Sequence, residues 1–233
     1  MTMIAIRLIA VFIVAYLLGS LSFAIIISKV FFKQDIRNFG SGNAGMTNVL
    51  RTFGKGAAVA TFAGDFLKGS RAVLFAKFIF SARTLNYTGP YPSINIGPAT
   101  VTIDRVFWYE TAMYIAVAGA LLGHLFPLYF KFKGGKGISV AFGAATTALP
   151  VLTLSAFGVF LVVFLISRMV SLASVLSVVF FFIFVMARFF ITGTFSLPTF
   201  IVATICPCVI IYAHRANIKR ILNGTEYRFT KKK

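Results

Sequence analysis

The feature that most constrains this chain is a set of long apolar runs that are hydrophobic on every face of a helix. Residues 151–166, for example, contain no charged side chain. A helix in a soluble core keeps polar residues on its outer side, whereas a helix in lipid is apolar all round. Only 12% of the 233 residues are charged, against about a quarter in soluble domains. We therefore expect an all-α integral membrane protein forming a single domain over residues 1–233.

Six apolar stretches account for the expected membrane spans. Five of them are single candidates, the last one short, and they cover 4–28, 57–80, 107–130, 172–190 and 197–212. The sixth, 138–166, would measure roughly 43 Å as one helix, which exceeds the roughly 30 Å hydrocarbon core. Pro150 interrupts its middle, so the stretch is either one kinked span or two short helices.

Positive charges decide between these alternatives, because cytoplasmic loops are enriched in Lys and Arg. With two helices in 138–166, the loops on one side hold sixteen Lys and Arg, and the loops and span ends on the other side hold four. With one helix the partition is nine against eleven. We therefore predict seven transmembrane helices, with the N-terminus outside, the C-terminus in the cytoplasm, and residues 81–106 in an outer loop.

The net charge of +18 is compatible with nucleic acid, anionic lipid or a phosphorylated substrate as partner. The basic residues follow the membrane topology and do not gather on one soluble face, so we expect no nucleic acid. Cys206 and Cys208 have no second cysteine pair and no nearby histidine. We therefore expect no metal ion and no cofactor.

The first cytoplasmic loop, residues 38–51, is crowded with Gly, Ser, Asn and Thr. Glycines allow backbone N–H groups to turn toward one point, which suits an anion, and an arginine fork suits phosphate oxygens. The donors we single out are Ser41, Gly42, Asn43, Thr47, Asn48 and Arg51. A plain turn followed by a cytoplasmic arginine is an equal alternative.

The second loop follows a membrane span and leads straight into the helix expected from Ile138. It contains His124 and then Lys133, Gly134, Gly135, Lys136 and Gly137. A helix N-terminus preceded by glycines and a lysine attracts phosphate through its free N–H groups and dipole. The alternative for the lysines is simple anchoring at the membrane surface, and His124 is equally a satisfied polar residue at a helix end.

The third cytoplasmic stretch, 214–226, has helical spacing that puts His214 and Asn217 on one face. Its Lys and Arg residues also suit anionic lipid. Glu226 is the only carboxylate among seven basic residues of the tail, and we expect it to pair with an arginine and to serve a structural purpose.

Polar residues also occur inside or at the ends of the apolar segments. Asp65 and Lys68 stand at i and i+3 in the second span, where an ion pair lowers the cost of burial and supports a nearby site. Ser171 and Ser174 lie at the cytoplasmic end of a later span. They are helix caps or donors to the same ligand.

These motifs, in this order, resemble the bacterial acyl-phosphate-dependent glycerol-3-phosphate acyltransferases. The resemblance rests on G-S-G-N-x-G-x-T-N-x-x-R at 40–51, G-H-x-F-P with F-K-G-G-K-G at 123–137, and H-x-x-N-I-x-R-x-x-x-G-x-E at 214–226. The family commonly has Pro and Ala where this chain has Ala44 and Met46, and Pro at Ser22. The polar positions of the motifs are intact.

The resemblance implies seven membrane helices, a bacterial plasma membrane and an active site at the cytoplasmic face. It implies transfer of an acyl chain from acyl phosphate to the 1-hydroxyl of glycerol 3-phosphate, which gives lysophosphatidate and phosphate in the first acylation of phospholipid synthesis. The partners are then acyl phosphate, glycerol 3-phosphate and membrane lipid. The oligomeric state is not predicted.

On this basis we expect Lys136 and the neighbouring glycine amides to hold glycerol 3-phosphate. Ser41, Asn43 and Arg51 then hold the phosphate and carbonyl of the donor, although the two assignments are interchangeable. Asn217 and Ser174 would orient the acceptor hydroxyl, and the base is either His214 or the donor phosphate. The alternative function is a transporter or flippase for organic phosphates, which would need a matching anion site on the outer side.

Overall fold

The structure is a computed structural model that describes residues 2–81, 93–96, 99–102 and 104–229. These residues are mainly helical and form two compact units. The first unit comprises Met1–Ala148 with Phe195–Thr199, and the second comprises Leu149–Thr194 with Phe200–Lys233.

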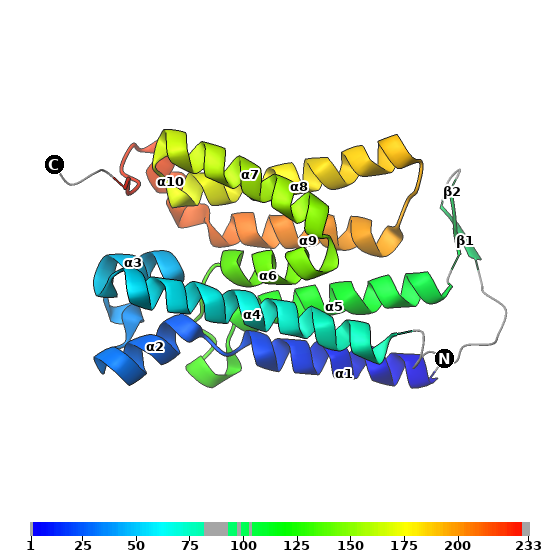
Figure 1. Cartoon of the computed structure of the whole chain (residues 1–233), viewed down its shortest axis with the longest axis horizontal. Helices are drawn as coiled ribbons and strands as arrows, with labels where there is room; N and C mark the ends of the chain where they lie inside the picture. The colour runs from blue at the N-terminus through cyan, green and yellow to red at the C-terminus, as the bar shows by residue number, and fades with distance from the viewer. Residues whose placement is uncertain (1, 82–92, 97–98, 103, 230–233) are drawn as a thin grey trace. The chain divides into compact units, whose positions relative to one another are not determined.

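In the first unit, α1, α4 and α5 run side by side, and α6 lies against α4 and α5 (Figure 1). The elements of this unit are α1 (Thr2–Gly19), α2 (Phe23–Phe32), η1 (Ile36–Asn38), α3 (Met46–Phe53), α4 (Lys55–Ile79), β1 (Ser93–Ile96), β2 (Ala99–Thr102), α5 (Arg105–Leu125), η2 (Leu128–Phe130) and α6 (Ile138–Ala148). β1 and β2 pair in antiparallel orientation, which an all-helical prediction did not include. The predicted outer loop 81–106 otherwise lies mostly outside the described residues.

Glycines allow these helices to approach closely. A Cβ added to Gly123 of α5 would lie 2.2 Å from the carbonyl oxygen of Tyr16 in α1. A Cβ on Gly143 of α6 would lie 2.0 Å from the carbonyl oxygen of Phe66 in α4, and one on Gly69 would lie 2.2 Å from that of Val140. Small residues at helix contacts are the usual means of packing helices in a membrane.

The first predicted span, 4–28, is not one continuous helix. α1 ends at Gly19 and α2 begins at Phe23. The break releases the carbonyl oxygen of Leu21, which accepts a hydrogen bond of 2.6 Å from Lys68 Nζ. The Ser20 hydroxyl accepts another bond from the backbone N–H of Leu128. Backbone groups freed inside an apolar protein need such partners, and neither partner is apparent from the local sequence.

The ambiguous stretch 138–166 is two helices, as the charge count predicted. α6 ends at Ala148, and Pro150 is the first residue of α7, a position that requires no N–H donor. The 11 residues of α6 span roughly 16 Å at 1.5 Å per residue, about half of the hydrocarbon core. α6 is therefore a half-length helix.

Four described helical segments are long and apolar enough to cross a membrane, and a fifth is obtained if one bent pair of helices counts as a span. The four are Thr2–Phe32, Arg105–Phe130, Pro150–Ser167 and Val170–Thr192. α4 is 25 residues long but carries several charged residues, and α6 is short. The integral membrane class is thus supported, whereas the seven-span count and the orientation of the termini stay predictions.

The second unit contains α7 (Pro150–Ser167), α8 (Val170–Thr192), α10 (Arg215–Leu222) and most of α9 (Leu197–Ala213). α7 and α8 pack together, and Arg168 makes the turn between them with a φ of 58°. The axes of α9 and α10 differ by 60°. The tail returns to the α7–α8 turn, where the N–H of Phe229 donates to the carbonyl oxygen of Arg168 at 2.9 Å.

Candidate functional site

The first loop is organised around the side chain of Asn48, which is 1% exposed. Its Oδ1 accepts from the N–H of Ser41 at 3.0 Å, and its Nδ2 contacts the carbonyl oxygens of Ile36, Phe39 and Asn43 at 3.2, 2.9 and 3.1 Å. We predicted Asn48 as a substrate donor. In the structure its amide bonds to the backbone of the loop itself, so Asn48 fixes the shape of the loop, and a contact with substrate stays a prediction.

The remaining predicted donors of this loop are more accessible. Ser41, Gly42 and Arg51 are exposed, and Asn43 and Thr47 are half-buried. Gly40 and Gly42 have φ values of 57° and 70°, a conformation that glycine adopts without strain. The loop thus presents several polar groups around a fixed backbone.

The second loop folds back onto the end of α5. The N–H groups of Gly134 and Gly135 donate to the carbonyl oxygens of Leu125 and His124 at 3.2 and 3.1 Å. A Cβ on Gly135 would lie 2.3 Å from His124 Nε2 and 2.5 Å from the carbonyl oxygen of Ala44. Gly135 therefore lies where the first loop, the second loop and His124 meet.

The half-helix α6 starts immediately after this loop. Gly137 has a φ of 89° and Ile138 is the first helical residue. Lys133 is exposed, and Lys136 is half-buried beside the helix start. A helix N-terminus that follows glycines and a lysine is suited to phosphate through its N–H groups and dipole.

A charged pair that sequence analysis did not single out holds the two loops together. Arg37 donates from Nε and Nη2 to the two carboxylate oxygens of Asp35, at 2.9 and 2.7 Å. Its Nη1 also donates to the carbonyl oxygens of Phe130 and Lys133, at 2.9 and 3.3 Å. The hydrogen bonds from the Arg37 side chain lower the pKa of Asp35 from 3.8 to about 2. The D-x-R spacing was the only sequence signal for this bridge.

The predicted ion pair of α4 is present and includes a third member. Lys68 Nζ lies 2.7 Å from Asp65 Oδ1 and 3.0 Å from Nδ1 of His124 on α5. Asp65, Lys68 and His124 are 1%, 3% and 3% exposed. Asp65 and Lys68 thus contact His124, which lies beside Gly135 of the second loop. That they support the site stays a prediction.

A separate polar cluster lies in the second unit around Glu226. Its Oε1 accepts from Ser171 Oγ and Asn217 Nδ2, both at 2.8 Å, and its Oε2 accepts from Arg220 Nε at 2.7 Å. Burial disfavours the Glu226 carboxylate, but these hydrogen bonds outweigh burial and hold its pKa below the usual value. The predicted arginine pair is Arg220.

This cluster fixes residues for which we predicted catalytic or binding functions. Ser171 and Asn217 are buried and bound to Glu226. Ser174 is also buried, one turn along α8. His214 Nδ1 lies 2.8 Å from the carbonyl oxygen of Ile210, and since a carbonyl only accepts, Nδ1 carries the proton in the neutral ring.

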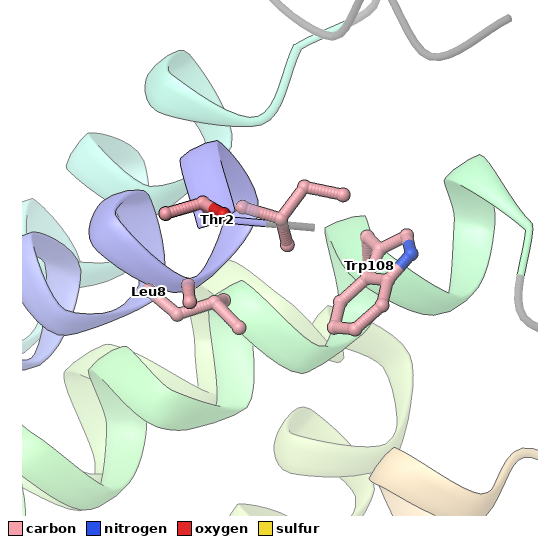
Figure 2. Close-up of a pocket in the computed structure, with 5 residues that line it drawn as sticks. Thr2, Leu8 and Trp108 are labelled. Atoms are coloured by element: carbon pink, nitrogen blue, oxygen red, sulfur yellow. The ribbon is translucent and has the colours of Figure 1, made fainter. Parts of the chain in front are cut away.

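The first unit also has a pocket of about 290 Å³ at the N-terminal ends of α1 and α5. Thr2, Leu8 and Trp108 line it (Figure 2), together with Ile4 and Ala5. Among the residues that the structure describes, no charged side chain lines this pocket. Trp108 is roughly 24 Å from His124 along α5 at 1.5 Å per residue, so the pocket is remote from the polar loops.

The fold and these clusters define a multi-pass helical membrane protein whose glycine-rich loops suit a phosphorylated ligand. The sequence matches, over residues 9–224, the family model described as glycerol-3-phosphate acyltransferase. The chain belongs to this family, and it is therefore an acyltransferase of the membrane.

Curated relatives named glycerol-3-phosphate acyltransferase match nearly the full chain. That of Clostridioides difficile is 41% identical over 221 residues, with 95% of each chain covered. That of Cupriavidus metallidurans is 38% identical over 222 residues, with 95% of this chain and 96% of the relative covered.

Two solved structures are also similar to this chain. Both are crystal structures of PlsY, an integral membrane glycerol 3-phosphate acyltransferase. The glycerol 3-phosphate form has a TM-score of 0.76 at 35% identity and covers 96% of both chains. The lysophosphatidic acid form has a TM-score of 0.73 at 34% identity, covering 96% of this chain and 95% of that one.

Proposed function

We propose that the chain transfers an acyl group from acyl phosphate to the 1-hydroxyl of glycerol 3-phosphate. The hydroxyl oxygen forms an ester bond with the acyl carbon, the bond from that carbon to the phosphate oxygen breaks, and lysophosphatidate and phosphate leave. The observation that carries the proposal is the near-full-length similarity to a glycerol 3-phosphate form and a lysophosphatidic acid form of PlsY. We also propose that residues 1–233 form a single domain, because the family match runs through both units.

The loop at 134–137 and the start of α6 are the proposed site for glycerol 3-phosphate. Lys136 supplies a positive charge, and the glycine backbone supplies N–H donors at a helix N-terminus. Ser41, Asn43 and Arg51 of the first loop are proposed to hold the donor phosphate and its carbonyl. Preorganised donors for charge that develops on these oxygens are each worth about 10²- to 10³-fold in rate.

His214 is the proposed acceptor of the hydroxyl proton. Since its Nδ1–H is directed at the carbonyl oxygen of Ile210, Nε2 of the neutral ring carries the lone pair that takes up a proton. Asn217, held by Glu226, is proposed to orient the hydroxyl. If turnover of His214→Ala stays within about threefold of the parent, the donor phosphate takes this proton instead.

We also propose that the protein spans a bacterial plasma membrane seven times with its site at the cytoplasmic face. The sixteen-to-four partition of Lys and Arg supports this topology. Labelling of single cysteines from either side of sealed vesicles tests it, with one cysteine at position 42 and another at position 2. Labelling of position 42 from the outer side would overturn the proposed orientation.

The activity is tested with purified protein in lipid and labelled glycerol 3-phosphate. One reaction contains palmitoyl phosphate and a second contains palmitoyl-CoA. Product from palmitoyl phosphate alone supports the proposal. Product from palmitoyl-CoA alone overturns the donor assignment, and binding of glycerol 3-phosphate without product from either donor would indicate transport.

A further inference from the structure

The contacts among Asp65, Lys68 and His124 indicate which ring nitrogen of His124 carries the proton. The Lys68 ammonium donates to the carbonyl oxygen of Leu21 at 2.6 Å and lies 3.0 Å from His124 Nδ1, within hydrogen-bond distance. It also forms an ion pair with Asp65 Oδ1 at 2.7 Å. An ammonium only donates, so Nδ1 is an acceptor and carries no hydrogen. The proton of the neutral imidazole is then on Nε2.

The ion pair explains why the positive charge belongs to the lysine. Asp65 Oδ1 is 2.7 Å from Lys68 Nζ but 3.6 Å from His124 Nδ1. Coulomb attraction is larger at the shorter separation, and one carboxylate balances one cation. Ammonium and neutral imidazole is therefore the favoured distribution of protons in this buried group.

The resulting Nε2–H points toward the junction of the two loops. Nε2 lies next to Gly135 of the second loop, close to where the carbonyl oxygen of Ala44 in the first loop approaches. Among the described residues, the ring makes hydrogen-bond contact only through Nδ1. This N–H is therefore available to an oxygen of a ligand at the junction.

We propose that Asp65 and Lys68 are positioning residues that hold His124 in its Nε2–H tautomer, and that this N–H donates to a phosphate oxygen of the substrate at the 134–137 loop. The inference rests on the proposed function for the identity of that substrate. The proposed phosphate site otherwise consists of backbone N–H groups and Lys136. His124 would add a neutral donor to it, and a buried ion pair would fix the direction of that donor.

The tautomer can be measured directly because the chain has two histidines. Nitrogen-15 NMR of histidine-labelled protein in lipid distinguishes protonated from unprotonated ring nitrogens, and a His214→Gln sample assigns the two rings. We expect His124 to be protonated at Nε2 and His214, by its contact with Ile210, at Nδ1. A His124 ring that is protonated at Nδ1, or at both nitrogens near neutral pH, would overturn the inference.

Kinetics and ligand titration test the second half of the proposal. His124→Ala should lower kcat/KM for glycerol 3-phosphate by about 10²- to 10³-fold, and His124→Gln, which keeps an N–H near that place, should recover most of the loss. The double variant Asp65→Asn with Lys68→Met removes the ion pair without leaving a lone charge. It should mix the His124 tautomers and lower kcat/KM by an intermediate factor.

Lys77→Met is the matched control, because Lys77 is another α4 lysine that donates to a backbone oxygen, that of Thr147 at 2.6 Å, without contacting His124. It should leave the His124 spectrum and kcat/KM unchanged. Separate additions of glycerol 3-phosphate and inorganic phosphate show which phosphate shifts Nε2. If neither ligand shifts it, or His124→Ala stays within about threefold of the parent, the donor assignment is wrong. Absence of acyl transfer by the parent would instead contradict the proposed function and leave the tautomer measurement valid.

Discussion

Replacing Gly135 with alanine perturbs the site by one methyl group at a defined place. The new Cβ would lie 2.3 Å from His124 Nε2 and 2.5 Å from the carbonyl oxygen of Ala44. Ordinary contacts of a Cβ begin at 3.4 Å. The loop and its neighbours must therefore separate by about 1 Å, and this overpacking typically costs about 1 to 3 kcal/mol.

The histidine is poorly able to absorb this shift. Lys68 and Asp65 hold its ring from the other side, at Nδ1. The backbone N–H of Gly135 is also bonded to the carbonyl oxygen of His124. A misplacement of about 1 Å at a reacting site can lower the rate by about 10²-fold, and we expect a loss of this size in kcat/KM for glycerol 3-phosphate.

The assay is acyl transfer from palmitoyl phosphate in lipid, together with the thermal unfolding midpoint of each protein. Gly56→Ala is the matched control, because Gly56 is in α4 and a Cβ there meets no atom within 4 Å. Activity of Gly135→Ala within about threefold of the parent would refute the argument that this contact sets the site geometry.

Three further predictions concern the residues that hold the site in place. Glu226→Ala leaves buried donors without their acceptor and should lower the free energy of unfolding by about 3 to 5 kcal/mol in chemical denaturation, whereas Glu226→Gln should cost less. Arg37 lowers the pKa of Asp35 from 3.8 to about 2. The stabilisation that the Asp35 carboxylate contributes is therefore full above pH 3.8 and is lost as the pH falls through about 2. In Asp35→Asn the free energy of unfolding should depend less on pH in that window. Asn48→Asp keeps the acceptor of the loop but loses its N–H donors, so it should cost about 2 to 3 kcal/mol and reduce acyl transfer, measured by unfolding and by product formation.

The local sequence was sufficient to place most helices. Apolar runs predicted spans at 57–80, 107–130 and 172–190, and the structure has α4, α5 and α8 there within a few residues. Pro150, together with the length of its segment and the distribution of Lys and Arg, predicted that residues 138–166 form two helices. The apolar runs and the proline geometry are set by neighbouring residues, and the partition of charge is read along the whole sequence.

The break at Ser20–Ser22 could not be predicted in the same way. The first apolar run continues through the break without a proline or a charge. Its released carbonyl group at Leu21 is satisfied by Lys68, 47 residues further along the chain. Gly19, Ser20 and Ser22 are small residues that permit a break, but a partner at that distance cannot be read from the residues near it.

For the candidate site, the sequence by itself determined which residue types are present: glycines where backbone must approach closely, donors for phosphate, and an ion pair in an apolar helix. Only the tertiary structure decided what each residue contacts. Asn48 bonds to its own loop, Arg37 joins two loops, and Lys68 contacts His124. The physical reason is that a polar side chain has several possible acceptors, and the packing of distant helices determines which of them lies within hydrogen-bond distance.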